Sequence, residues 1–148
     1  MFTVQGRKVR KKKRRQCELA DLWLFAECSA KELERLASLG TRIGVSAGRM
    51  LIERGTRGAE VLVVLTGSAR CFVNGTEIAR FGPGDFFGEV AVMVGGSRTA
   101  TVVADTDMEV IVLSPWEFES LLHESPTVVR RIVEVMAERL RRADALAG

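Results

Sequence analysis

The stretch Phe87–Ala104, reading FGEVAVMVGGSRTATVVA, decides more about this chain than any other part of it. It sets Gly88 beside Glu89, continues through small and apolar residues, and then places a single arginine, Arg98, before Thr-Ala-Thr. A planar guanidinium can donate two parallel hydrogen bonds to a phosphate, and a glycine lets the backbone approach a ligand closely. The free N–H groups of a helical turn after Gly88 would also favour a negatively charged ligand group. The stretch therefore predicts an anion-binding loop.

The sequence on both sides of this loop is typical of a β-rich domain. From Thr41 to Leu113, short runs rich in β-branched residues are separated by glycines, and Asn74-Gly75 between two runs is a strong signal for a two-residue hairpin. Many short strands with regular turns indicate a sandwich or a barrel rather than a parallel sheet. The runs that we expect to be strands are Val61–Leu65, Ala69–Val73, Glu77–Phe81, Thr99–Ala104 and Met108–Leu113.

Helical patterns flank this region, so the fold class that we predict is α+β: an antiparallel β-barrel of jelly-roll type over residues 41–113, between helices at 18–40 and a helix pair at 114–147. Ser29 and Glu32 are spaced as a capping box. Ser114-Pro115 and Ser125-Pro126 are typical of helix starts, because proline is tolerated in the first turn.

The last helix carries an apolar seam with heptad spacing. Such a seam can pair two chains or pack against the barrel, and the sequence leaves both possibilities open. The seam consists of Val129, Val133, Met136, Leu140, Ala143 and Ala147.

The charge is divided unevenly along the 148 residues. Residues 1–16 hold eight basic and no acidic side chains, which leaves fourteen basic against nineteen acidic in residues 17–148, a balance of −5. We expect residues 1–16 to be a flexible tail, because like charges repel, and residues 17–148 to be one domain. An anionic partner, either lipid headgroups or nucleic acid, would suit the tail.

Cysteine usage and hydropathy suggest a cytoplasmic protein, with attachment to the inner membrane surface as an alternative through the tail. Three cysteines at irregular spacing form no disulfide framework. Neither a secretory signal nor the roughly 18 apolar residues of a membrane span is expected.

From Leu19 to about Arg142 the chain resembles the cyclic-nucleotide-binding domains of catabolite activators, cyclic-nucleotide-dependent kinases and gated channels. The resemblance rests on the Phe87–Ala104 stretch, on the glycines Gly55, Gly58 and Gly67, and on the lead-in GPGDFFGE at residues 82–89. It implies that Phe87–Ala104 is the phosphate-binding cassette between strands and that the ligand is cAMP or cGMP, without a cofactor or a metal.

The resemblance also implies individual roles for residues of this chain. Those expected at the phosphate are Arg98, Thr99 and Ala100; at the ribose, Gly88 and Glu89; in the backbone and pocket wall, Phe87, Val90 and Ala91; and at the base, Thr99 and Asp144. Where catabolite activators carry a Thr-Ser pair that touches adenine, this chain has Ala143-Asp144, so the base contact is the least defined part of the site.

The expected function is a non-catalytic cyclic-nucleotide sensor, with cAMP favoured over cGMP. The last helix would close over the ligand about a hinge at Leu121–Pro126, and no catalytic triad or carboxylate pair indicates an enzyme. One alternative is a regulator that associates with nucleic acid or membrane through the tail, although no helix-turn-helix is expected. Another is a degenerate copy of the fold that acts as an interaction module; homodimerisation through the last helix fits both this and the sensor, and the effector protein is unknown.

Overall fold

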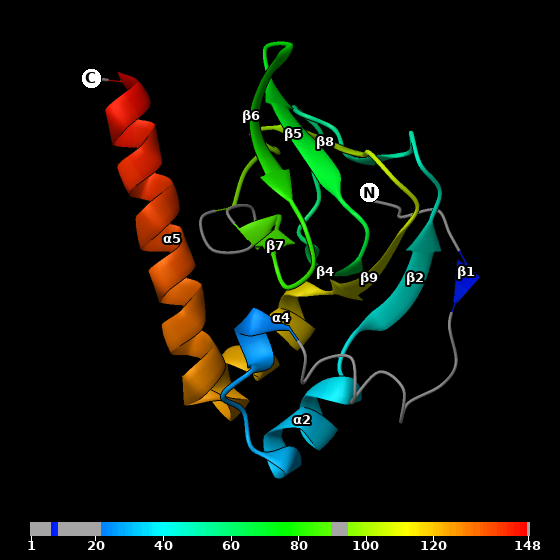
Figure 1. The fold of residues 1–148 in the computed structure, drawn as a ribbon, viewed down its shortest axis with the longest axis vertical. Coiled ribbons are helices and arrows are strands. Elements are labelled where there is room, and N and C mark those ends of the chain that lie inside the picture. Colours follow the sequence, from blue (N-terminus) through cyan, green and yellow to red (C-terminus); the bar gives the residue numbers. More distant parts are fainter. Residues whose placement is uncertain (1–6, 9–21, 90–94, 148) are drawn as a thin grey trace.

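The computed structural model describes residues 7–8, 22–89 and 95–147, with side chains described between Leu22 and Arg142. Two antiparallel sheets face each other, and the helices cover one side (Figure 1). The five-stranded sheet has the order β1-β2-β9-β4-β7 and the four-stranded sheet has the order β3-β8-β5-β6. The strands are β1 (Arg7–Lys8), β2 (Thr41–Val45), β3 (Met50–Ile52), β4 (Val61–Thr66), β5 (Ala69–Val73), β6 (Thr76–Phe81), β7 (Phe86–Phe87), β8 (Thr101–Ala104) and β9 (Met108–Leu113).

The predicted antiparallel jelly-roll fold is confirmed, with one refinement. The described strands form a sandwich of two sheets, and hydrogen bonding does not close them into a single barrel. The five predicted strands are all present, although β8 begins at Thr101 instead of Thr99. Asn74 and Gly75 both have positive φ, 52° and 78°, as the predicted hairpin between β5 and β6 requires.

Strand β4 contributes side chains to two hydrophobic cores, one on each face of the larger sheet. Five consecutive residues of β4, VLVVL, are buried, so the strand has no polar face. Val61 and Val63 pack into a core shared with the helices, whereas Leu62 and Val64 pack between the two sheets. Because side chains alternate across a strand, β4 is covered on one face by helices and on the other by the second sheet.

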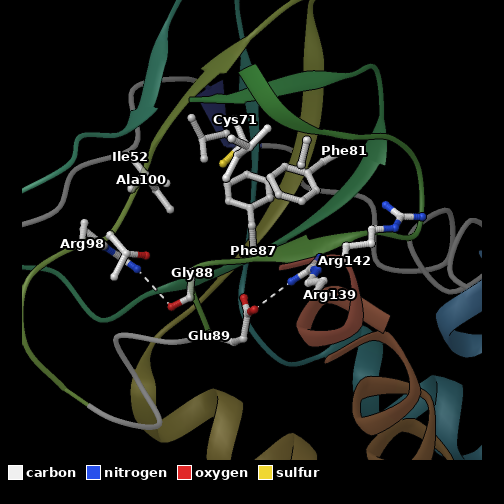
Figure 2. Close-up of a pocket in the computed structure, with 14 residues that line it drawn as sticks. Ile52, Cys71, Phe81, Phe87, Gly88, Glu89, Arg98, Ala100, Arg139 and Arg142 are labelled. Atoms are coloured by element: carbon white, nitrogen blue, oxygen red, sulfur yellow. Dashed lines mark hydrogen bonds and ion pairs between the residues drawn. The ribbon is translucent and has the colours of Figure 1, made fainter. Parts of the chain in front are cut away.

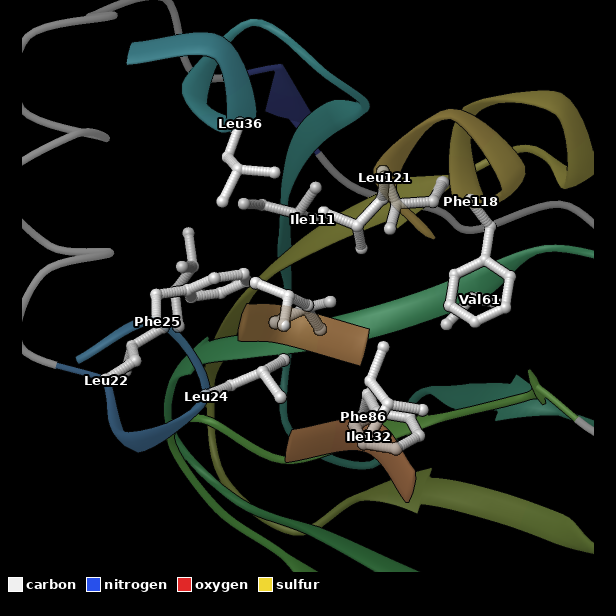
Figure 3. Packing of buried hydrophobic residues seen from close by; sticks show 14 of the residues in the cluster. Leu22, Leu24, Phe25, Leu36, Val61, Phe86, Ile111, Phe118, Leu121 and Ile132 are labelled. Atoms are coloured by element: carbon white, nitrogen blue, oxygen red, sulfur yellow. The ribbon is translucent and has the colours of Figure 1, made fainter. Parts of the chain in front are cut away.

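The helices are shorter at the N-terminal side than the sequence predicted. In place of helix across residues 18–40, the described part contains a 3₁₀ helix, η1 (Trp23–Phe25), and α2 (Ala30–Ala37). Ser29 and Glu32 form the predicted capping box at the start of α2. Figure 3 shows Leu24 and Phe25 of η1 in the same core as Ile132 of the last helix.

Two helices follow β9 and are joined at a single extended residue. Helix α4 (Pro115–Glu124) begins with a capping box between Ser114 and Glu117, and α5 (Pro126–Ala147) begins directly after Ser125. Ser125 has φ −137° and ψ 94°, which is extended backbone, so α4 and α5 are separate helices that meet at a joint. This joint lies within the predicted hinge segment Leu121–Pro126.

The buried face of α5 is offset from the predicted seam. Val128 and Ile132 are buried, and Val135 and Met136 pack against the same core. Met136 is the seam residue that contributes to this packing, whereas Val133 and Leu140 are 58% and 65% exposed. The side chains of Ala143 and Ala147 lie outside the described residues.

The predicted basic tail enters the described structure at one place. Arg7 and Lys8 form β1, which pairs with Gly44 and Ile43 of β2 at the edge of the larger sheet. The remaining basic residues, 10–15, lie outside the described residues, so the flexibility and the anionic partner of the tail stay predictions. In the part of the chain that the structure describes, no helix combines the length and the apolar character of a membrane span.

Candidate functional site

A cavity of about 280 Å³ lies between the cassette, the inner face of the smaller sheet and α5 (Figure 2). Its wall is mostly apolar, and the rings of Phe81 and Phe87 stack there with centroids 4.9 Å apart. Cys71 also lines this wall, and burial raises the pKa of its thiol, so the side chain acts as a small apolar residue. The polar groups are concentrated at the two ends and along the floor.

Arg98 supplies the positive charge at one end of the cavity. Its side chain is almost fully buried, with 4% of the residue exposed. Nη1 donates to the carbonyl oxygen of Gly88 at 3.0 Å, and Nη2 donates to the carbonyl oxygen of Glu60 at 3.0 Å. Burial lowers the pKa of Arg98, while the carboxylates of Glu60 and Glu89 oppose that shift. The guanidinium is therefore oriented by acceptors within the fold.

The backbone around Arg98 is held by a neighbouring loop. The Arg98 N–H donates to the carbonyl oxygen of Thr56 at 2.8 Å, and the Gly55 N–H donates to the carbonyl oxygen of Arg98 at 2.9 Å. Ser97 forms an isolated bridge with Arg57. These bonds fix the arginine end of the cassette to the segment that follows β3.

Gly88 occupies a position that only glycine can fill without strain. Its φ is +93°, and a Cβ atom there would lie 2.6 Å from the carbonyl oxygen of Glu60 and 3.0 Å from Nη1 of Arg98. The glycine is thus required by close packing against the Glu60 carbonyl oxygen and the Arg98 guanidinium, and the predicted approach of the Gly88 backbone to a ligand stays a prediction.

Glu89 lies on the floor of the cavity and is bound to α5. Glu89 is only 5% exposed, and its Oε1 accepts a hydrogen bond from Nη1 of Arg139 at 2.7 Å. Arg139 also donates to the carbonyl oxygen of Phe86 and stacks over the rings of Phe86 and Phe81. The cassette is in this way connected directly to the last helix.

Sequence reasoning did not identify Arg139 or Arg142, both of which line the cavity. A signal for Arg139 was present, because it follows Val128, Ile132 and Val135 at steps of four, three and four residues and so shares their core-facing stripe. An arginine in a stripe that is otherwise apolar requires a buried partner. Its partner, however, is fifty residues away in sequence.

The structure brings most of the predicted site residues together. Phe87, Gly88, Glu89, Arg98, Thr99 and Ala100 all line the one cavity. Thr99 is exposed at its rim. Val90, Ala91 and the side chain of Asp144 lie outside the described residues. The individual ligand contacts assigned to all of these residues stay predictions.

This arrangement suits a ligand with one anionic group, one hydroxyl group and one flat apolar part. The guanidinium of Arg98 matches the anion, the carboxylate of Glu89 matches the hydroxyl, and the phenylalanine wall matches the ring. Among the residues that the structure describes, no group of histidine, cysteine, aspartate and glutamate side chains could hold a metal ion. The single histidine, His123, lies exposed in the last turn of α4.

The fold and the cavity together define the class of the domain: a β-sandwich with a mostly apolar cavity that a buried arginine lines at one end. The family model of the cyclic nucleotide-binding domain matches residues 42–125. The chain belongs to the family of proteins that carry this domain.

Known proteins support the same assignment. The cyclic AMP receptor protein of Thermus thermophilus is 30% identical over 126 residues, which cover 82% of this chain and 58% of that protein. A cAMP-binding acyltransferase from Mycobacterium smegmatis superimposes with a TM-score of 0.74 at 27% identity, over 90% of this chain and 43% of that chain. The PKAR CBD2 domain bound to Sp-2Cl-cAMPS superimposes with a TM-score of 0.76 at 23% identity, over 91% and 92% of the two chains, and supports the fold. This chain spans less than two thirds of the cyclic AMP receptor protein.

Proposed function

We propose that this chain is a non-catalytic cyclic-nucleotide sensor, with cAMP favoured over cGMP, and that α5 closes over the bound ligand. The observation that carries the proposal is the cavity that holds Arg98 at one end and Glu89 on its floor, with stacked phenylalanines between the sheets. The family model and the relatives support it because the same stretch of this chain matches both.

The phosphate would bind to Arg98. A buried guanidinium forms stronger hydrogen bonds to an anion than an exposed one, because water competes less for its donors. The ribose hydroxyl would donate to Glu89. A carboxylate has room for several donors, so Oε2 can accept from the ligand while Oε1 keeps its bond to Arg139.

Closure of α5 would depend on the Glu89–Arg139 contact. A ligand hydroxyl that donates to Glu89 would add a second hydrogen bond to the carboxylate that holds the middle of α5, while the joint at Ser125 would let the helix tilt. A ligand shifts such an equilibrium only by the difference in its affinity for the two states. Closure therefore requires that the ligand bind better when Arg139 is in place.

The preference for cAMP draws its support from the relatives that are described as a cyclic AMP receptor protein and a cAMP-binding acyltransferase. Within the chain itself, Thr99 at the rim could contact either the phosphate or a base, so it does not distinguish the two nucleotides.

Calorimetric titration of cAMP and cGMP into the wild-type protein and the Arg98→Ala variant tests the proposal. Loss of one partner of a buried charge pair costs roughly 2–5 kcal/mol, so Arg98→Ala should weaken binding at least about 30-fold. Arg141→Ala, which removes an exposed arginine of α5, is the matched control and should bind like the wild type. Binding that ignores the Arg98 substitution would contradict the site assignment, and tighter binding of cGMP would contradict the nucleotide preference.

We further propose that the seam on α5 pairs two copies of the chain. Val133 and Leu140 are exposed on α5 although both are large and apolar, which supports an interface rather than packing within one chain. Sedimentation velocity with and without cAMP tests this, and a monomer at every concentration would exclude it.

A further inference from the structure

The guanidinium of Arg98 is shared with a carboxylate that the proposed ligand contacts do not use. Nη2 of Arg98 lies 3.5 Å from Oε2 of Glu60, in addition to its bond to the Glu60 carbonyl oxygen. The Glu60 side chain is held in place, because the N–H of Ala59 donates to the same Oε2 at 3.2 Å. Glu60 stands directly before β4, the central buried strand, so its backbone is fixed as well.

This contact partly offsets the positive charge at the Arg98 end of the cavity. One guanidinium, Arg98, faces the Glu60 carboxylate, and the charge of Glu89 is offset by Arg139. Arg142 lies on the α5 side of the cavity, away from Arg98, as Figure 2 shows, and it pairs with Glu138. An anion that binds to Arg98 must therefore lie near the Glu60 carboxylate.

We propose that Glu60 is a specificity-determining residue that selects the singly charged cyclic phosphodiester and rejects the doubly charged phosphomonoester of a 5′-nucleotide. This inference rests on the proposed cyclic-nucleotide site. A phosphomonoester carries a charge of about −1.5 to −2 at pH 7, because its second pKa is about 6, whereas a cyclic phosphodiester carries only one negative charge. Opening the ring with water converts one into the other, so a sensor that ignores the product needs this distinction.

The size of the effect follows from Coulomb's law. Two anions on one guanidinium lie roughly 6 Å apart, and at an effective dielectric constant of about 20 each additional charge at that distance weakens binding at least about tenfold. A cyclic phosphate incurs this repulsion once, and a phosphomonoester incurs it up to twice. Repulsion built against the wrong ligand is a common source of specificity.

The experiment compares three ligands by calorimetry at pH 7.5: cAMP, 5′-AMP, and the 5′-methyl ester of AMP. The methyl ester has an open chain like AMP but a single charge like cAMP, so it separates charge from shape. The variant is Glu60→Gln, which keeps an oxygen acceptor and the Arg98–carbonyl bond while removing the charge. Glu53→Gln is the control, because it removes the same charge from an exposed position of the neighbouring loop.

We expect the wild type to bind cAMP and the methyl ester better than AMP. In Glu60→Gln the affinity ratio of cAMP to AMP should fall about tenfold, the ratio of cAMP to the methyl ester should stay unchanged, and Glu53→Gln should match the wild type. An equal change for all three ligands in Glu60→Gln would mean that Glu60 only positions Arg98, and the inference would be overturned.

Two further outcomes keep the inference separate from the proposed function. If Glu60→Gln fails to fold, the comparison of AMP with its methyl ester in the wild-type protein still tests the inference. Equal affinities of the wild type for these two ligands would exclude discrimination by charge. If the wild type binds no cyclic nucleotide at all, the proposed function itself fails, and this inference fails with it.

Discussion

Replacing Arg139 with alanine should loosen α5 from the cassette. The substitution removes the 2.7 Å hydrogen bond to Glu89 and the bond to the Phe86 carbonyl oxygen. It also removes two contacts with aromatic rings, in which the guanidinium carbon lies 4.6 Å from the centroid of Phe86 and 5.2 Å from that of Phe81. Glu89 would be left as a buried charge without this partner.

The cost can be estimated from these contacts. Breaking a buried ion pair by removing one partner costs about 3–5 kcal/mol, and a cation–π contact contributes about 0.5–1 kcal/mol at an exposed site. The Arg139 side chain is 29% exposed, so water reaches the pair and screens it. We therefore expect a loss of roughly 2–3 kcal/mol in the free energy of unfolding, and at about 2–4 °C per kcal/mol a fall in Tm of roughly 4–12 °C.

Urea unfolding of the single and double variants measures this directly. In a cycle of Arg139→Ala with Glu89→Gln, the double variant should be more stable than the sum of the two losses predicts, by at least about 1 kcal/mol, because the neutral glutamine no longer needs the cation. Arg141→Ala, whose side chain is 78% exposed, should stay within about 0.5 kcal/mol of the wild type. If the stability losses of the two substitutions are additive, or if Arg139→Ala and Arg141→Ala lose equal stability, the Glu89–Arg139 contact does not hold α5 against the cassette.

Two other predictions concern backbone geometry and pH. Gly88→Ala should destabilise the fold by on the order of 2 kcal/mol and also abolish ligand binding, because the new Cβ would lie within 3.0 Å of both the Glu60 carbonyl oxygen and Arg98. Gly67→Ala is strained in the same way but lies far from the cavity, so it should destabilise the fold without changing the affinity for ligand. Thermal melting measures the loss of stability of each variant, and calorimetry measures its affinity. The hydroxyl of Ser125 lowers the pKa of Glu32, so Glu32 contributes stability that is present above its ordinary pKa and lost as the pH falls through the lowered value. Urea unfolding between pH 7 and pH 3 should therefore show a larger loss for the wild type than for Glu32→Gln, and parallel curves would contradict the Ser125 contact.

Local signals in the sequence were sufficient for much of the fold. The Asn74-Gly75 hairpin, the capping box at Ser29 and the helix start at Ser114 were predicted because each depends on residues within four positions of one another. The same holds for Gly88, where one backbone conformation excludes every side chain. The order of the strands within the two sheets was not predicted, because it depends on pairings such as β2 with β9 that no local pattern encodes.

The site was predictable where the family motif is continuous in sequence and not beyond it. Arg98 and Glu89 lie within ten residues of each other, and the structure brings both to one cavity. Arg139 and Glu60 are distant in sequence, and each binds through a geometry that only the packed fold creates. The apolar pattern of α5 fitted a heptad seam as well as the true buried stripe, because the two stripes lie on adjacent faces of the helix.

The attachment of α5 at two points has a mechanical consequence. Ser125 is anchored to α2 through its 2.6 Å hydrogen bond to Glu32, and Arg139 is anchored to the cassette. At a rise of about 1.5 Å per residue, Arg139 lies roughly 21 Å from the Ser125 end and Ala147 roughly 33 Å from it. If α5 rotates about its fixed end at Ser125, Ala147 therefore moves about 1.5 times as far as Arg139 does. The helix can thus act as a lever that converts a small movement at the Glu89–Arg139 contact into a larger one at its far end.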